Sequence, residues 1–479
     1  MDYDIIIVGA GPAGLSIAQC CSFLNKKILI IEKEKDIGGC HRVRRLGNFF
    51  TEHGPRVYSS TYCVFRSLLS KMGLNFFDMF EPYKFNITTI GKETLWSVLS
   101  FNELLVLFID FMSLLLNENY GKNISINEHT KDFSDKSKEI LDRMCRLTDG
   151  ATSEKYTLNE FLQLLNQQFL YGLYQPKRPN DIGLFKEWKE YLKKMGVVFL
   201  LNTNVEKLKT KNDLVSSIIV KNEMGEENEI FAKKFILAVP PIPLVSLIKN
   251  NDLTKDAFGD FKELKTWSEK TSYIDYITVT FHWDTKLNLP YVYGFPKSDW
   301  GLAFIVLTDY MKFNEKESKT VITASVTIKN KKSKRINKLI DECDESILIK
   351  EMFNQLKEAY PLIPDPTLSL LSPGVKKINN EWKCIDTAFI STSGEKNLES
   401  NSKKFKNLYN AGTHNGKSIY KFTSLESAVT NGVKCSHLLY PELKNDFSII
   451  SSYTLKEIFI IILLITIIIC IIMKKNKYI

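Results

Sequence analysis

Residues Tyr3–Glu32, with the sequence YDIIIVGAGPAGLSIAQCCSFLNKKILIIE, carry the clearest structural pattern in this chain of 479 residues. The apolar runs Tyr3–Val8 and Lys27–Ile31 predict two strands that are buried on both faces of a parallel sheet. Between them lie a glycine-rich turn and a segment, Leu15–Leu24, that we interpret as a helix. Strand, turn, helix and strand form one βαβ unit, so we expect an α/β protein.

The turn between the two strands matches the pattern G-x-G-x-x-G over residues 9–14. Gly9 permits the tight turn, Gly11 lets a pyrophosphate approach the backbone, and Gly14 lets the helix pack closely on the sheet. Glu32, at the end of the second strand, is placed to bond the ribose hydroxyls of an adenosine. A glycine turn that binds nothing would leave this acidic residue unexplained. We therefore predict a dinucleotide site formed by Gly9, Gly11, Pro12, Ala13, Gly14 and Glu32.

The composition narrows the class of protein. The net charge of +9 comes from lysines scattered along the chain without a long basic run, which argues against nucleic-acid binding. The nine cysteines include no C-x-x-C pair, so neither a disulfide framework nor a metal site is indicated. We expect a reducing compartment. A chain of this length also predicts at least two structural lobes.

Two apolar runs bear on membranes. Residues 458–473 contain no charged residue and are followed by lysines, which predicts a single-pass C-terminal transmembrane anchor after a linker at 446–457. A buried terminal helix is the alternative. Because Asp2 and Asp4 replace the positive start of a signal peptide, we expect the main domain to lie in the cytosol. The run Leu104–Leu116 is too short to span a membrane, and we favour a buried core helix over one that dips into a membrane surface.

A second glycine turn follows Glu32. Gly38-Gly39, with Arg42 soon after, favours FAD over NAD, since a second turn beside the pyrophosphate suits a long, enclosed flavin nucleotide. Together with residues 50–56, FTEHGPR, this turn resembles the superfamily of FAD-dependent flavin amine oxidases, phytoene desaturases and protoporphyrinogen oxidases. In that family an arginine usually follows the glycines directly, whereas here Cys40 holds its place and Arg42 comes later. The resemblance implies that Arg42 contacts the cofactor and that Gly54, Pro55 and Arg56 lie in front of the flavin ring.

The resemblance returns in two later segments. Asn204-Val205 occupies the place of the family's adenine-contacting strand, and residues 407–414, NLYNAGTH, match the segment whose Ala-Gly pair meets the flavin's phosphate and ribityl portion. The helix that follows would point its N-terminus at the flavin, and Thr423 with Glu426 predicts a capping box there. His414 is a candidate for tuning the flavin. The implied cofactor contacts are Val205, Gly412, Thr413, Ser424 and Leu425.

These segments predict a discontinuous, Rossmann-like FAD-binding domain with a parallel sheet and an inserted α+β substrate domain. The cofactor domain would comprise residues 1–56, 184–250 and 396–445. The substrate domain would take a helical part from 57–183 and a part with a sheet and helices from 251–395. The linker and the transmembrane helix follow.

We predict a membrane-anchored FAD-dependent oxidoreductase of the amine oxidase and desaturase type, in which hydride passes from an apolar or amine substrate to non-covalent FAD. His53, in the segment expected before the ring, and Tyr420, after the Ala-Gly pair, are the candidate catalytic residues. The strand Tyr276–Trp283 has no lysine, although amine oxidases of the family commonly carry one there. Two other functions stay open: a redox-neutral flavoenzyme of the isomerase or mutase type, and a flavoprotein scaffold without activity.

Overall fold

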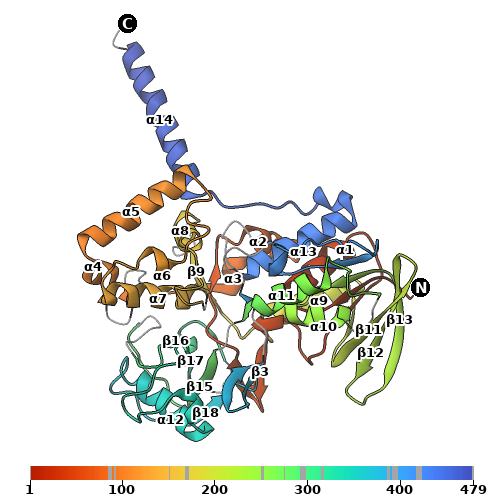
Figure 1. Ribbon diagram of the computed structural model, residues 1–479, viewed down its shortest axis with the longest axis horizontal. Helices are drawn as coiled ribbons and strands as arrows, with labels where there is room; N and C mark the ends of the chain where they lie inside the picture. Colours follow the sequence, from red (N-terminus) through yellow and green to blue (C-terminus); the bar gives the residue numbers. More distant parts are fainter. Residues whose placement is uncertain are drawn as a thin grey trace.

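The computed structural model describes residues 2–84, 89–90, 93–149, 151–167, 172–249, 253–273, 276–291, 298–313, 318–385, 389–390, 397–416 and 423–476. Figure 1 shows a sheet flanked by helices, a helical part and a second sheet beside it, and one helix, α14, that projects away from the rest. The helices are α1 (Pro12–Ser22), α2 (Cys63–Lys71), α3 (Phe76–Met79), α4 (Leu95–Val98), α5 (Phe101–Leu116), α6 (Ile126–His129), α7 (Asp135–Asp149), α8 (Leu158–Asn166), α9 (Leu184–Lys194), α10 (Pro241–Lys249), α11 (Phe261–Lys270), α12 (Glu345–Leu356), α13 (Leu425–Leu439) and α14 (Leu455–Asn476). The strands are β1 (Tyr3–Val8), β2 (Ile28–Ile31), β3 (Val43–Leu46), β4 (Phe49–Glu52), β5 (Tyr58–Ser59), β6 (Phe80–Pro82), β7 (Thr89–Ile90), β8 (Glu93–Thr94), β9 (Leu173–Pro176), β10 (Val198–Leu200), β11 (Thr203–Lys211), β12 (Leu214–Asn222), β13 (Glu227–Leu237), β14 (Ser272–Tyr273), β15 (Ile277–Trp283), β16 (Leu302–Val306), β17 (Thr320–Val326), β18 (Leu368–Leu371), β19 (Val375–Ile378), β20 (Glu381–Cys384), β21 (Phe389–Ile390) and β22 (Leu408–Asn410).

The largest sheet orders its strands β10-β2-β1-β13-β12-β11, and β22 pairs with β13. Strands β1, β2, β10, β13 and β22 run parallel to one another, whereas β11, β12 and β13 form an antiparallel meander. The sheet is therefore mixed, and the prediction of a parallel sheet is wrong at this edge. The cause is a short connection: Asn212-Asp213 joins β11 to β12, with Asn212 in the left-handed region at φ 57°, and a two-residue turn joins antiparallel strands.

Three distant segments of the chain supply the parallel strands. Val8 at the end of β1 aligns with Leu237 on β13, and Leu237 in turn aligns with Asn410 on β22. Because these strands are parallel, their carboxyl ends meet at one edge of the sheet. The glycine turn at residues 9–14 and the Ala-Gly pair at residues 411–412 therefore lie at the same edge.

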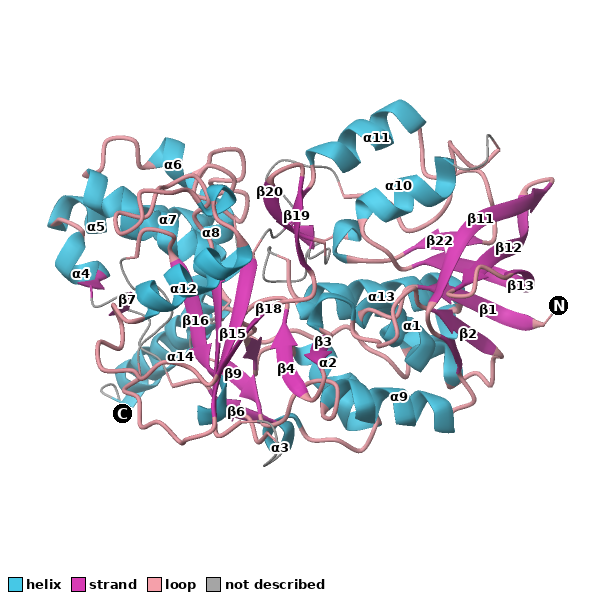
Figure 2. Cartoon of the chain, turned by 90° about the horizontal axis from the view of Figure 1, so that it is seen from below, coloured by secondary structure: helices cyan, strands magenta, loops and turns pink. Residues whose placement is uncertain are grey.

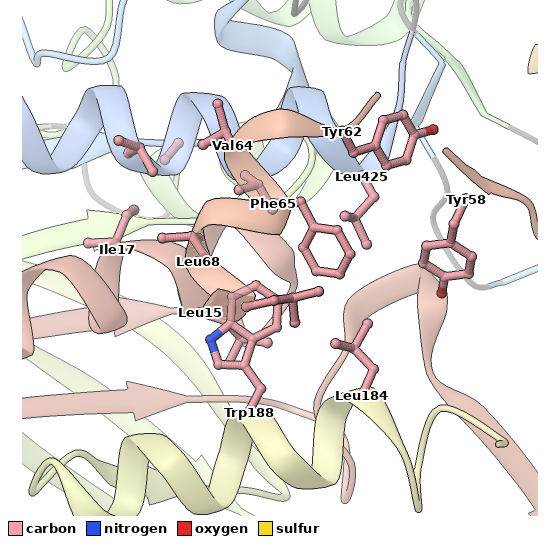
Figure 3. Close-up of a cluster of buried hydrophobic side chains, with 14 of the residues drawn as sticks. Leu15, Ile17, Tyr58, Tyr62, Val64, Phe65, Leu68, Leu184, Trp188 and Leu425 are labelled. Carbon is pink, nitrogen blue, oxygen red and sulfur yellow. The ribbon is translucent and has the colours of Figure 1, made fainter. Parts of the chain in front are cut away.

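Helices α1, α2, α9 and α13 share one hydrophobic cluster beside the parallel strands. Figure 3 shows Trp188 of α9, Phe65 of α2, Leu15 of α1 and Leu425 of α13 in this cluster. Trp188 is fully buried, and its ring centroid lies 6.2 Å from that of Phe65. This shared core holds the first turn of α13 against α2.

A second sheet, ordered β16-β17-β15-β18, packs with α12 around its own core (Figure 2). The chain near β4 contacts this sheet: Thr278 Oγ1 donates to the carbonyl oxygen of His53 over 2.6 Å, and His282 Nε2 lies 3.1 Å from the carbonyl oxygen of Phe50. Burial lowers the pKa of His282 to about 4, so this histidine is neutral and structural. These bonds hold β4 and His53 against the second sheet.

The two apolar runs differ from expectation. Helix α14 extends beyond the predicted run, and its stretch Leu455–Met473 is long and apolar enough to cross a membrane and contains no buried residue. Helix α5 was predicted to be a buried core helix, and that prediction is wrong: Phe101, Phe108 and Leu116 are 79%, 59% and 86% exposed. The side of α5 that faces the protein buries Leu114 and Leu115 and also two carboxylates, Glu103 and Asp110.

Candidate functional site

The first glycine turn needs glycine at two of its three positions for the protein's own packing. Gly9 has φ +105°, and a Cβ placed on it would lie 2.4 Å from the carbonyl oxygen of Ala238. A Cβ on Gly14 would lie 2.1 Å from the carbonyl oxygen of Gly9. At Gly11 the nearest such atom is Gly39 Cα at 3.7 Å, an ordinary contact. The described residues thus leave room at Gly11, so a ligand can approach its backbone closely.

The second glycine turn packs directly on the first. The N–H of Gly38 donates to the carbonyl oxygen of Ala10 over 2.9 Å, and a Cβ on Gly39 would lie 3.1 Å from Gly11 Cα. Both Gly38 and Gly39 have positive φ, at 115° and 58°. Pro12 and Ala13 begin α1 at this point, with Pro12 at the first helical position, where a missing N–H costs nothing. The two turns therefore form one cradle of bare backbone at the N-terminus of α1.

Glu32 is buried beside this cradle. Its Oε2 accepts from the N–H of Ala10 over 2.8 Å, and its Oε1 accepts from the N–H of Glu34 over 3.1 Å. Arg42 Nη2 lies 3.5 Å from Glu32 Oε1, and Arg42 Nη1 lies 3.4 Å from Glu34 Oε1. The buried Nε of Arg42 has no hydrogen-bond partner among the described residues. The structure thus brings Glu32 and Arg42 together, and the Nε–H group of Arg42 remains able to donate to a ligand.

The Ala-Gly pair closes the same edge of the sheet from the other side of β13. The N–H of Ala411 donates to the carbonyl oxygen of Leu237 over 3.1 Å. Asn431 of α13 donates through Nδ2 to the carbonyl oxygens of Gly412 and Gly416, over 2.8 and 2.6 Å. Thr413 begins a short 3-10 turn. Helix α13 therefore holds the shape of the loop that begins at Gly412.

His414 lies within this loop and is buried. Its Nε2 is 3.0 Å from Asn410 Oδ1, and its ring fills the space where a Cβ on Gly412 would lie, 2.6 Å from His414 Cε1. Burial lowers the pKa of His414 to about 3, so the imidazole is neutral. The His414 side chain thus packs against Gly412 and supports the loop.

The start of α13 differs from the predicted capping box. Ser424 is the N-cap and accepts from the N–H of Ser427 over 3.1 Å. Glu426, expected to cap α13 with Thr423, instead accepts from the N–H groups of Val64 and Phe65 over 2.8 and 3.0 Å. The predicted box is wrong because the carboxylate instead accepts from buried N–H groups in the first turn of α2, which have no acceptor within their own helix. Burial raises the pKa of Glu426 to about 7, against the opposing effect of these two bonds.

Helices α1 and α13 are in close contact, and this contact joins the glycine turn at residues 9–14 to the Ala-Gly pair at residues 411–412. A Cβ on Gly432 would lie 2.6 Å from the carbonyl oxygen of Ala13 and 2.9 Å from Ser16 Cβ. The absence of a side chain at Gly432 therefore lets the two helices approach. Their N-terminal turns carry the predicted contacts Pro12, Ala13, Ser424 and Leu425.

The end of β4 and the residues that follow it bring further polar groups together. His53 is buried, and its Nδ1 lies 2.9 Å from Cys384 Sγ. Glu52 is 5% exposed, and burial raises its pKa to about 8 although the Arg56 guanidinium acts in the opposite direction. Arg56 donates through Nη2 to the carbonyl oxygen of Cys40, next to the second glycine turn. This segment therefore runs from the second sheet to the cradle.

The other predicted site residues, Gly54, Pro55, Val205 and Tyr420, come from different parts of the chain. A Cβ on Gly54 would lie 3.0 Å from Tyr276 Cδ2, so Gly54 passes close to the second sheet, and Pro55 follows it half-buried. Val205 is buried in a hydrophobic cluster that includes Ile31, one residue before Glu32. Tyr420 lies outside the described residues.

Sequence reasoning missed Glu52 and Cys384. Glu52 stands directly before His53 at the end of a strand that begins with two phenylalanines, and this pattern could have indicated a buried carboxyl group. Cys384 comes from β20, far along the chain, and carried no local signal. The described part of the chain contains no group of three His, Cys, Asp or Glu residues that could hold a metal ion.

Comparisons with known proteins agree with this geometry. The family model of an NAD(P)-binding Rossmann-like domain matches residues 7–71, and no curated protein matches the chain. An oxidoreductase from Methanosarcina mazei has a TM-score of 0.63 and 15% identity, over 90% of this chain and 99% of its own. A protein of Exiguobacterium sp. 255-15 assigned as a protoporphyrinogen oxidase has a TM-score of 0.60 and 16% identity, over 92% and 99%. Putrescine oxidase with putrescine bound has a TM-score of 0.63 and 14% identity, over 92% and 99%.

These structures cover almost the whole of this chain as well as themselves, so the likeness includes both sheets and not the N-terminal unit alone. The resemblance inferred from the glycine turns and from the Ala-Gly pair is confirmed at the level of the fold. With its paired turns and its returning third segment, the chain has the fold of these oxidoreductase structures.

Proposed function

We propose that this protein is a membrane-anchored oxidoreductase that binds FAD non-covalently between the paired glycine turns and the Ala-Gly bend. One observation carries the proposal: the glycine turn at residues 9–14 and the Ala-Gly pair at residues 411–412 lie at the carboxyl edge of one sheet, on either side of β13. The backbone at Gly11 has room there for a ligand to approach closely. Open α/β sheets bind nucleotides at this edge. The redox-neutral and scaffold functions have no separate observation in their favour.

The proposal assigns a part of the cofactor to each group of residues. Gly11 and the N-terminus of α1 would receive the pyrophosphate, which the helix dipole stabilises. Glu32 would accept from the ribose hydroxyls, and the donor left on Arg42 would serve a phosphate or ribose oxygen. The Gly412 loop and the first turn of α13 would meet the flavin half. FAD, when bound, supplies the two-electron acceptor for the reaction.

Two side chains at the end of β4, Glu52 and the following His53, are proposed to handle protons. Glu52 holds a proton at neutral pH, because burial raises its pKa to about 8. His53 stands next to it with its ring oriented by Cys384, so a proton released by the substrate would reach this pair. We propose an apolar or amine substrate, in keeping with the putrescine bound by the structural relative.

Helix α14 is proposed to anchor the protein in a membrane with the main domain in the cytosol. Leu455–Met473 has a mean hydropathy of 3.0 and is not buried against the rest of the protein. Exposure of such a helix to water is energetically unfavourable, whereas the hydrocarbon core of a bilayer accommodates it.

The test uses the full chain purified in detergent. A yellow protein whose flavin is released by acid denaturation supports non-covalent FAD, and anaerobic bleaching by an amine or an isoprenoid supports oxidation. Bleaching by dithionite alone, with turnover that depends on pre-reduced flavin, replaces the proposal by a redox-neutral function. A colourless protein that takes up no added FAD refutes it. Flotation of the chain with lipid vesicles tests the anchor separately.

A further inference from the structure

The outer side of helix α5 is unlike that of a helix on the surface of a soluble protein. Its inward side carries the buried residues Leu114 and Leu115 together with two carboxylates, Glu103 and Asp110, which are 9% and 3% exposed. Its outward side is apolar, although soluble proteins place charged and polar residues there. We define the outer face of α5 as six of its exposed apolar residues, Phe101, Leu105, Phe108, Ile109, Met112 and Leu116.

The inward carboxylates are fully used within the protein. Glu103 completes the capping box with Ser100 and also accepts from the N–H of Ser134 over 2.7 Å. Asp110 accepts from the hydroxyl of Tyr120 over 2.6 Å and lies 2.7 Å from His129 Nε2. These bonds fix the rotation of the helix about its axis. The outer face is therefore held outward by the fold.

The base of α14 lies at the end of this face. Both α5 and α14 contact α8. The N–H of Lys456 in the first turn of α14 donates to Asn166 Oδ1 at the end of α8 over 3.2 Å. Lys456 Nζ also lies 4.0 Å from Glu118 Oε1, two residues beyond the end of α5. Figure 1 shows α14 leaving the body beside α5, with α5 running across its base.

We infer that the outer face of α5 lies in the headgroup and acyl boundary of the bilayer that α14 crosses. The inference rests on the proposed anchor, because a helix across the base of a transmembrane segment lies at the membrane surface. Contiguous exposed apolar surface next to such a segment matches the chemistry of that boundary. Trp96 on α4, directly before α5, is 68% exposed, and tryptophan favours the same depth.

The experiment reconstitutes the full chain in phosphatidylcholine vesicles with and without brominated acyl chains. A tryptophan is added at Phe108→Trp or, as a control, at Leu362→Trp, a 97% exposed site in the loop after α12. Both variants carry Trp96→Phe to remove the native reporter. We expect brominated lipid to quench most of the emission added by Phe108→Trp and none of that added by Leu362→Trp, with aqueous iodide showing the reverse.

Two results would overturn the inference while leaving the anchor in place. In the first, the chain floats with vesicles but iodide quenches Phe108→Trp as strongly as Leu362→Trp. In the second, neither iodide nor brominated lipid quenches Phe108→Trp, which means that protein covers the face. A chain that fails to float refutes the anchor and the inference together, so the two failures are distinguishable.

Discussion

The substitution Gly11→Ala separates cofactor binding from folding. Gly11 has φ −76° and ψ 175°, which any residue adopts, and a Cβ there has only an ordinary contact at 3.7 Å. Alanine therefore fits without strain and lowers the entropy of the unfolded chain. The free energy of unfolding of the cofactor-free protein is expected to rise by about 0.4–1 kcal/mol. The added methyl group occupies the space proposed for the pyrophosphate, so FAD binding is expected to be lost.

The assay is urea unfolding of deflavinated protein with and without added FAD. For the unsubstituted protein, FAD at 100 times its Kd adds about 2.7 kcal/mol to the free energy of unfolding. For Gly11→Ala it is expected to add nothing. Gly47→Ala is the control: Gly47 has φ +59° and nothing within 4 Å, so alanine costs about 1–2 kcal/mol of strain and FAD binding is unchanged. Tight FAD binding by Gly11→Ala, or loss of its fold, would refute the assignment of this turn.

Three further substitutions test the site. Glu426→Ala leaves two N–H groups of α2 without their acceptor and is expected to lower the free energy of unfolding in urea by about 2–6 kcal/mol, whereas Glu442→Ala on an exposed turn changes it by under about 0.5 kcal/mol. The folded-state pKa of Glu52, about 8, exceeds its ordinary value of 4.5, so its contribution to stability is present below pH 4.5 and is lost as the pH rises toward 8. Glu52→Gln should remove this part of the pH dependence, measured by urea unfolding at pH 5 and pH 8. His53→Gln should lower turnover by about 10²-fold or more with the flavin content unchanged, and equal turnover would exclude a proton-transfer role.

Local sequence was enough for the elements whose physical cause is local. The buried strand and the glycine turn within residues 3–14 follow from a hydrophobic run and from the backbone freedom of glycine. The helix predicted over Leu15–Leu24 is present, but it begins earlier, at Pro12, and ends at Ser22. The position of Gly412 at the same sheet edge could also be predicted, although only from the resemblance, because β22 has three residues and is too short to show a hydrophobic pattern of its own.

The errors concern partners that are distant along the chain. Glu426 satisfies the capping pattern for its own helix, yet the N–H groups of Val64 and Phe65 compete for it across the fold. Strand direction at β11 and β12 depends on the conformation of Asn212 rather than on hydrophobicity. For α5, an apolar run appears the same whether its outer side meets protein or another apolar medium, so periodicity alone could not distinguish the two.

The return of the chain at β22 has a consequence for biosynthesis. A nascent polypeptide that ends before Leu408 contains β1, β13 and both glycine turns but lacks the wall that Gly412 and α13 provide. Contacts over such sequence separations form late in folding. Under the proposed function, the cofactor would be enclosed only after β22 and α13 have been synthesised.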